Sequence, residues 1–86
     1  MGRCYITFLS QTAAYRFKRV AIEYGFSVNI VQTPKEISYG GCSYAAKCDC
    51  DTALRLIDVC RRKGISYSKI FQEKADINGR RKYIEV

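Results

Sequence analysis

The sequence predicts a small α+β domain, with one antiparallel sheet and two helices packed on one of its faces. Two observations carry this prediction: short aromatic and β-branched segments that alternate like strands, and two longer segments with apolar residues at helical spacing. They follow one another in the order β-α-β-β-α-β, and right-handed crossovers applied to that order give a ferredoxin-like sandwich. With 86 residues, the chain is predicted to be a single domain, residues 1–86.

The first half of the chain contains a strand, a helix and a second strand. Residues 4–9 (CYITFL) are typical of a strand, and Ser10 or Thr12 is placed to cap the helix that follows. Gly25 predicts the left-handed residue that ends this helix, and Phe26 after it suits a Schellman closure. Residues 26–32 alternate as a half-buried strand does. The inner face of the helix is expected to consist of Ala13, Phe17, Val20, Ala21 and Tyr24.

A tightly specified turn joins the two halves. Thr33 and Glu36 have the spacing of a capping box, and Pro34 suits the first helical position. Residues 34–38 are therefore expected to form one short helical turn, which the Gly40-Gly41 pair ends.

The second half repeats the strand-helix-strand pattern. Residues 42–48 are predicted to form the third strand, and Asp49 or Asp51 caps the helix after it. Gly64 ends that helix by the same device as in the first half, and residues 65–72 form the fourth strand. Its inner face is expected to consist of Ala53, Leu56, Ile57 and Cys60.

The last residues, 73–86, extend this core as a hairpin. Asn78-Gly79 is a strong signal for a two-residue turn, which would set Asp76 opposite Arg81. Residues 80–86 would then pair with a lengthened fourth strand.

Composition excludes several classes of function. The chain has no histidine, which removes the commonest general base and every imidazole metal ligand, so self-contained hydrolysis is not expected. The longest apolar run, residues 4–9, is too short to span a bilayer, and no export signal precedes it. A net charge of +7 favours acidic partners, with plain solubility as the alternative. We expect a cytoplasmic protein in which the five cysteines are reduced.

Cys42 is the candidate reactive thiol because it directly follows Gly40-Gly41. Two glycines leave the backbone free to take unusual angles and place no neighbouring side chain over the sulfur. Loop amides and the charge of Lys35, or of Lys47, would favour the thiolate that nucleophilic chemistry needs. The alternative is a strand-initiating cysteine that packs as a small hydrophobe.

Residues from Cys4 to about Gln72 resemble the selenium/sulfur carrier-like family of small bacterial and archaeal proteins. Members share a Thr-Pro-Lys/Arg-Glu-Ile-Ser segment that leads through a small-residue turn to a cysteine. The matching residues here are Thr33, Pro34, Lys35, Glu36, Ile37, Ser38 and Cys42.

The resemblance implies a carrier without a cofactor. Cys42 would accept sulfur or selenium as a persulfide or selenopersulfide and hand it to a partner enzyme. The thiol environment would consist of Thr33, Pro34, Lys35, Glu36, Ser38, Gly40, Gly41 and Ser43. The chain departs from the family's pattern at Ser43, where relatives carry glycine, and at Gly40-Gly41, which replaces a turn that is often rich in serine.

The remaining cysteines allow further hypotheses. Cys48 or Cys50 could act as a resolving thiol for Cys42, although six residues of extended strand would separate Cys42 from Cys48 by about 20 Å. A metal site is not expected, because the cysteines lack a second Cys-x-x-Cys and a histidine. Cys4 and Cys60 fit the core pattern and are expected to be buried.

A binding module is the alternative from a different class. The same topology houses RNA-recognition modules, in which aromatic residues of the central strands stack on bases, and Tyr5 and Tyr44 would be those residues here. The same sheet face could instead be a homodimer surface formed by Tyr5, Leu9, Tyr44 and Tyr67.

Overall fold

The computed structural model describes residues 2–38 and 43–86 as five strands, two α-helices and one short 3₁₀-helix. The α+β class predicted from the sequence is confirmed. In chain order the elements are β1 (Arg3–Phe8), α1 (Gln11–Glu23), β2 (Asn29–Gln32), η1 (Lys35–Ile37), β3 (Tyr44–Asp49), α2 (Cys50–Lys63), β4 (Ile70–Ala75) and β5 (Arg81–Glu85).

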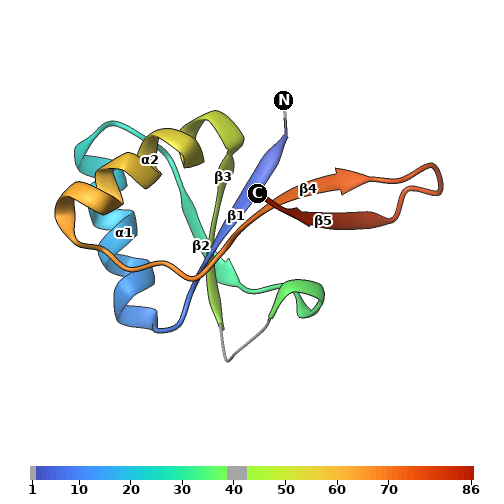
Figure 1. The fold of residues 1–86 in the computed structure, drawn as a ribbon, viewed down its shortest axis with the longest axis horizontal. Coiled ribbons are helices and arrows are strands. Elements are labelled where there is room, and N and C mark those ends of the chain that lie inside the picture. Colours follow the sequence, from blue (N-terminus) through green and yellow to red (C-terminus); the bar gives the residue numbers. More distant parts are fainter. Residues whose placement is uncertain (1, 39–42) are drawn as a thin grey trace.

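The five strands form one antiparallel sheet in the order β2-β3-β1-β4-β5. Both α-helices lie on the same side of this sheet, and the β4–β5 hairpin projects away from them (Figure 1). We call the side under the helices the helix face and the opposite side the second face.

The main core lies between the helix face and the two helices. Alternate residues of β1 point into it, so that Ile6 and Phe8 are fully buried there. Phe8 packs against Phe17 of α1 with ring centroids 5.2 Å apart. The four residues predicted for the inner face of α2 are all buried in this core.

The inner face of α1 is rotated slightly from the prediction. Ala14 is buried along with the predicted Phe17 and Ala21, whereas Tyr24, which was expected to face the core, is 47% exposed.

Local signals set the helix ends as predicted. The Ser10 hydroxyl accepts a hydrogen bond from the Ala13 amide at 3.1 Å, which caps α1. Gly25 has φ of +80°, and the amide of Phe26 donates to the carbonyl of Ala21, so α1 ends in a Schellman closure.

The helix α2 ends in the same way at Gly64, with φ of +70°. Asp49 occupies the N-cap of this helix, but its side chain makes no capping hydrogen bond.

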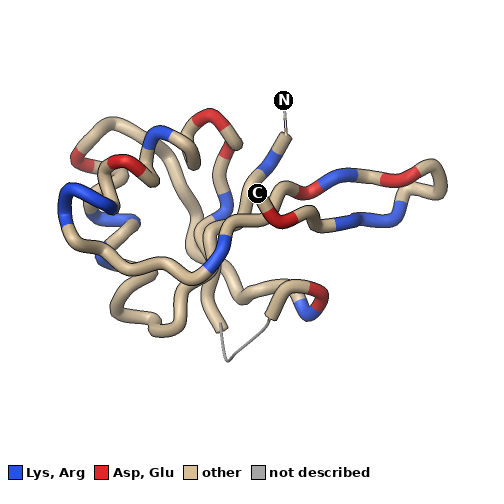
Figure 2. Tube along the Cα trace, in the orientation of Figure 1, with Lys and Arg blue, Asp and Glu red and all other residues tan. Residues whose placement is uncertain are grey.

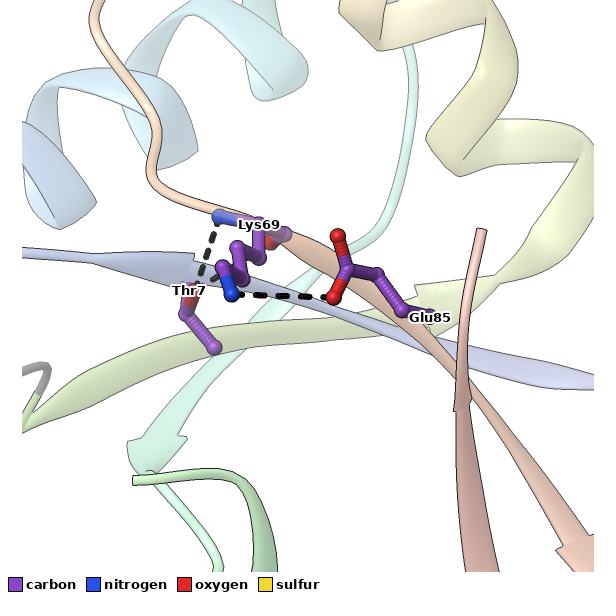
Figure 3. A network of polar contacts seen from close by, with 3 residues as sticks. All are labelled: Thr7, Lys69 and Glu85. Carbon is purple, nitrogen blue, oxygen red and sulfur yellow. Dashed lines mark hydrogen bonds and ion pairs between the residues drawn. The ribbon is translucent and has the colours of Figure 1, made fainter. Parts of the chain in front are cut away.

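The fourth strand begins later than predicted because of an irregularity opposite Thr7. The amide of Thr7 donates to the carbonyl of Lys69, while the amide of Ser68 donates to the carbonyl of Thr7. Ser68 and Lys69 therefore both lie opposite the single residue Thr7, which is the arrangement of a β-bulge. The Thr7 hydroxyl accepts from the Lys69 amide at 3.0 Å and donates to the Lys69 carbonyl, and the Lys69 ammonium lies 3.6 Å from Glu85 (Figure 3). Regular pairing of β4 with β1 starts at Ile70.

The C-terminal hairpin forms, but its predicted register is wrong by one residue. Ala75, rather than Asp76, lies opposite Arg81. The Asp76 carboxylate accepts hydrogen bonds from the amides of Asn78 and Arg80, and Gly79 has φ of +78°. The amide of Asp76 also donates to the carbonyl of Arg80 at 2.8 Å, which closes a loop of three residues, 77–79, in place of the predicted two-residue turn.

Candidate functional site

The segment that the sequence singles out, residues 33–38, folds as a single 3₁₀ turn over the second face. The amide of Ile37 donates to the carbonyl of Pro34 at 3.0 Å, and the amide of Ser38 donates to the carbonyl of Lys35. Pro34 occupies the N-cap position, and no side chain caps the turn. The predicted capping box is therefore wrong, although a short helical turn does form at the predicted place.

Ile37 anchors this turn on the sheet. Its side chain is 2% exposed and packs in a small cluster on the second face with Tyr5, Ala45 and Phe71. Tyr83 of β5 packs against the same cluster, and its ring lies edge-on to that of Tyr5 with centroids 5.6 Å apart. The apolar residue of the segment is thus buried, whereas Lys35, Glu36 and Ser38 are exposed around it.

Backbone pairing fixes Thr33 opposite Ser43. The Thr33 amide donates to the Ser43 carbonyl at 3.0 Å, one residue beyond the last β2–β3 pair. Cys42, the predicted carrier thiol, directly precedes Ser43 in the sequence but lies with Gly40 and Gly41 outside the described residues. The structure therefore describes both ends of the connection that carries Cys42.

The Thr33 hydroxyl is a buried polar group with no hydrogen-bond partner among the described residues. Buried hydroxyls almost always find a partner, so an unpaired one needs an explanation. It lies at the point where the segment and the strand after Cys42 meet.

The two lysines considered as partners of the thiol lie in different places. Lys35 begins η1, close in sequence to Thr33, and is exposed. Lys47 lies on β3 opposite Tyr5 and Asn29. It is four residues along the strand from Ser43, or about 13 Å at the rise of an extended chain.

A disulfide joins Cys4 to Cys50, with 4.9 Å between the two Cα atoms. This overturns the expectation that every cysteine is reduced. Cys4 is buried as predicted, at 3% exposure, and Cys50 is the first residue of α2. They meet because β1 and β3 pair antiparallel with Arg3 opposite Asp49, so the start of β1 lies beside the end of β3. The sequence analysis did not predict this disulfide. The signal that could have indicated it was the presence of one cysteine near the start of β1 and another directly after the end of β3, two strand ends that lie side by side in the predicted sheet.

The two cysteines described as free are both buried. Cys48 lies opposite Cys4 on β3, and Cys60 lies on the inner face of α2. Burial raises the pKa of each thiol to about 11, and the carboxylate of Asp49 contributes further to the rise at Cys48. Neither thiol is a ready nucleophile near neutral pH.

The predicted resolving thiols for Cys42 are thus one buried thiol, Cys48, and one disulfide sulfur, Cys50. A disulfide between Cys42 and either of these residues stays a prediction, because Cys42 lies outside the described ranges.

The aromatic face predicted for RNA binding is not formed as expected. Tyr5 points to the second face, where it is 3% exposed beneath Tyr83 and donates a hydrogen bond to Glu73. Tyr44 points the other way and packs against the core on the helix face. The direction of the Tyr44 side chain follows from its pairing with Phe8, because residues directly opposite each other on neighbouring strands point to the same face of the sheet. The two rings cannot form one stacking platform.

The residues expected to form a homodimer surface do not share one face, because Tyr67, like Tyr44, packs against the core on the helix face, whereas Tyr5 lies on the second face. Leu9 lies just beyond the end of β1 and is 68% exposed.

Charge is distributed rather than concentrated. Lys and Arg residues occur along both helices and along the β4–β5 hairpin (Figure 2). Within the described ranges, His, Cys, Asp and Glu side chains form no group of three that could hold a metal ion. At 13 and 14 residues, α1 and α2 lack the length and apolar character that crossing a bilayer requires.

The fold defines a small α+β protein with two α-helices on one face of a five-stranded antiparallel sheet. The family model described as "Putative Se/S carrier protein-like" matches residues 3–72, and the chain belongs to this family. The match covers the 33–38 segment and Cys42, and it stops before most of the β4–β5 hairpin. No curated protein and no solved structure matches the chain.

Proposed function

We propose that this protein carries a sulfur or selenium atom on Cys42, as a persulfide or selenopersulfide, and hands it to a partner enzyme. The observation that carries the proposal is the family match over residues 3–72, which includes the whole Thr-Pro-Lys-Glu-Ile-Ser segment and the cysteine after it. Chalcogen transfer is a thiolate exchange, which needs access and a suitable thiol pKa but neither a histidine nor a deep pocket.

The surroundings of the segment support this assignment. Ile37 packs the segment against the sheet, and the Thr33 amide donates a hydrogen bond to the carbonyl of Ser43, the residue after Cys42. The Thr33 hydroxyl has a hydrogen to donate and no acceptor among the described residues. In the proposal it donates to the loaded or ionised sulfur, while Lys35, Glu36 and Ser38 line the approach together with Pro34, Gly40, Gly41 and Ser43.

The remaining expectations belong to the same proposal. The fold is a ferredoxin-like sandwich formed by residues 4–72, which the strand order β2-β3-β1-β4 and the placement of both helices on one face support. The domain is a single one, extended by a hairpin over 73–86, and it works in the cytoplasm with a protein that donates the chalcogen and another that accepts it.

Selective alkylation and sulfur uptake test the role of Cys42. With Cys4 and Cys50 bonded and Cys48 and Cys60 buried, the unreduced protein should react with iodoacetamide first at Cys42. While the Cys4–Cys50 disulfide is intact, a cysteine desulfurase should load a persulfide that Cys42→Ser abolishes and Cys48→Ser leaves intact. Uptake by the unreduced protein that survives Cys42→Ser would end the carrier proposal.

A second experiment tests the hydroxyl. Thr33→Val keeps the shape of the side chain and removes the donor, so iodoacetamide should label Cys42 several-fold more slowly. Thr12→Val removes an exposed hydroxyl from the first turn of α1 and serves as the matched control. Equal labelling rates in the two variants would remove Thr33 from the thiol environment.

A further inference from the structure

The two residues joined by the Cys4–Cys50 disulfide differ in exposure. Cys4 is 3% exposed within β1, whereas Cys50, which packs against the edge of the core, is partly exposed at the start of α2. A pocket of about 90 Å³ opens beside Cys50, lined by Gly2, Asp49, Cys50, Asp51 and Thr52. An external thiol or persulfide can therefore reach Cys50 but not Cys4.

The backbone around this pair holds the two sulfurs within bonding reach. The amide of Cys50 donates to the carbonyl of Gly2 at 3.1 Å, which fixes the start of α2 beside the residues that precede β1. Gly2 passes so close that a Cβ there would lie 3.6 Å from the Cys50 sulfur and 2.9 Å from Nε2 of Gln72. Once the disulfide is opened, Cys4 needs no backbone movement to attack the Cys50 sulfur again.

Two further features suit an exchange site. Cys50 lies at the first residue of α2, at the partly exposed end of the pair. Cys48, the nearest competitor opposite Cys4, is buried and has a pKa raised to about 11 by desolvation. In this arrangement Cys50 is the outer cysteine, which reacts with small molecules in solution, and Cys4 is the inner cysteine, which reacts with Cys50.

We propose that Cys4 and Cys50 form a second sulfur-handling site, in which Cys50 takes up a sulfane sulfur and Cys4 releases it as hydrogen sulfide by closing the disulfide. This inference rests on the proposed function, since it assumes that the chain handles chalcogen, but it does not depend on Cys42. The structure represents the closed state that follows release.

The cycle has three balanced steps. Two molecules of a low-molecular-weight thiol reduce the disulfide to two thiols and become a disulfide themselves. The Cys50 thiolate then attacks the terminal sulfur of a small persulfide, forms a Cys50 persulfide and releases the small thiolate. Finally the Cys4 sulfur attacks the Cys50 sulfur, and the bond to the carried sulfur breaks. That sulfur leaves with both protons as hydrogen sulfide, and the two electrons that reduce it come from the sulfurs of Cys4 and Cys50, which are oxidised to the disulfide.

The experiment uses the full chain with Cys42→Ser, so that its outcome is separate from that of the carrier thiol. The reduced and desalted protein is mixed with glutathione persulfide, and intact mass and free sulfide are followed. The parent should return to the disulfide and release sulfide in equal amount. Adding Cys4→Ala should retain the mass of one extra sulfur, on Cys50, without releasing it. Adding Cys48→Ser should behave as the parent does.

Several results would overturn the proposal. The mechanism is wrong if Cys4→Ala leaves sulfide release unchanged, or if the extra sulfur is found on a residue other than Cys50. A second measurement covers the case in which Cys4→Ala does not fold. If glutathione reduces the disulfide only after urea has unfolded the Cys42→Ser protein, the bond is a structural staple alone. Reduction of the folded protein at a rate close to that of the unfolded one supports an exchange site.

Discussion

Replacing Ile37 with alanine tests whether its burial holds the candidate site in place. The side chain is 2% exposed, and the substitution removes three carbon atoms from the cluster with Tyr5, Ala45 and Phe71. At about 0.8 kcal/mol for each buried carbon, the lost transfer free energy is about 2.4 kcal/mol. A residual cavity adds to this, so the free energy of unfolding should fall by about 2–4 kcal/mol.

Urea denaturation followed by far-UV circular dichroism measures this loss. Ile77→Ala is the matched control, because Ile77 is fully exposed in the hairpin loop and should change the free energy of unfolding by less than about 0.5 kcal/mol. Hydrogen exchange adds a local measurement: in Ile37→Ala the amides of Ser38 and Thr33, bonded to Lys35 and Ser43, should lose protection first. A cost for Ile37→Ala as small as that of the control would refute the anchoring argument.

Three further predictions follow from the fold. Ser10→Ala removes the side-chain acceptor for the Ala13 amide and should cost about 1 kcal/mol in urea denaturation. Gly64→Ala forces an alanine to φ of +70° and should cost about 1–2 kcal/mol, measured in the same way, although nothing blocks the added methyl group. Burial and the hydrogen bond to Glu73 raise the pKa of Tyr5 to about 12. The unfolded chain therefore loses this proton first, so stability should fall as pH rises from about 10 to 12. Tyr5→Phe should reduce that fall, and an unchanged slope would contradict the assignment.

Local chemistry explains the parts of the fold that the sequence predicts well. Ser10, Gly25 and Gly64 fix the helix ends through capping hydrogen bonds and left-handed backbone angles, which depend only on near neighbours. The strand predicted at residues 4–9 likewise forms as β1, and its alternation places Ile6 and Phe8 in the core.

The errors arise where distant parts of the chain decide the outcome. The start of β4 depends on the bulge at Thr7, which arises only when β1 and the segment before β4 meet. The facing of Tyr44 depends on the register of β3 against β1, because a shift of one residue would turn its side chain over.

The candidate site shows the same division. The sequence singles out residues 33–38 and Cys42, and Pro34 with the residues after it predicted the short turn that forms at 35–37. The unpaired hydroxyl of Thr33 and the bond between Cys4 and Cys50 could not be predicted in this way, since both depend on how neighbouring strands pair.

The outermost strand has a consequence for how the protein behaves at high concentration. In the sheet that the described residues form, β5 is an edge strand. One side of it is hydrogen-bonded to β4, and a strand of another molecule could pair with its other side. Lys74 and Lys82 lie directly opposite each other on this hairpin, and Arg81 follows the loop. Their mutual repulsion weakens the hairpin slightly but also opposes edge-to-edge growth into fibres. Polyanions such as heparin, or high ionic strength, would weaken that protection by neutralising the same charges.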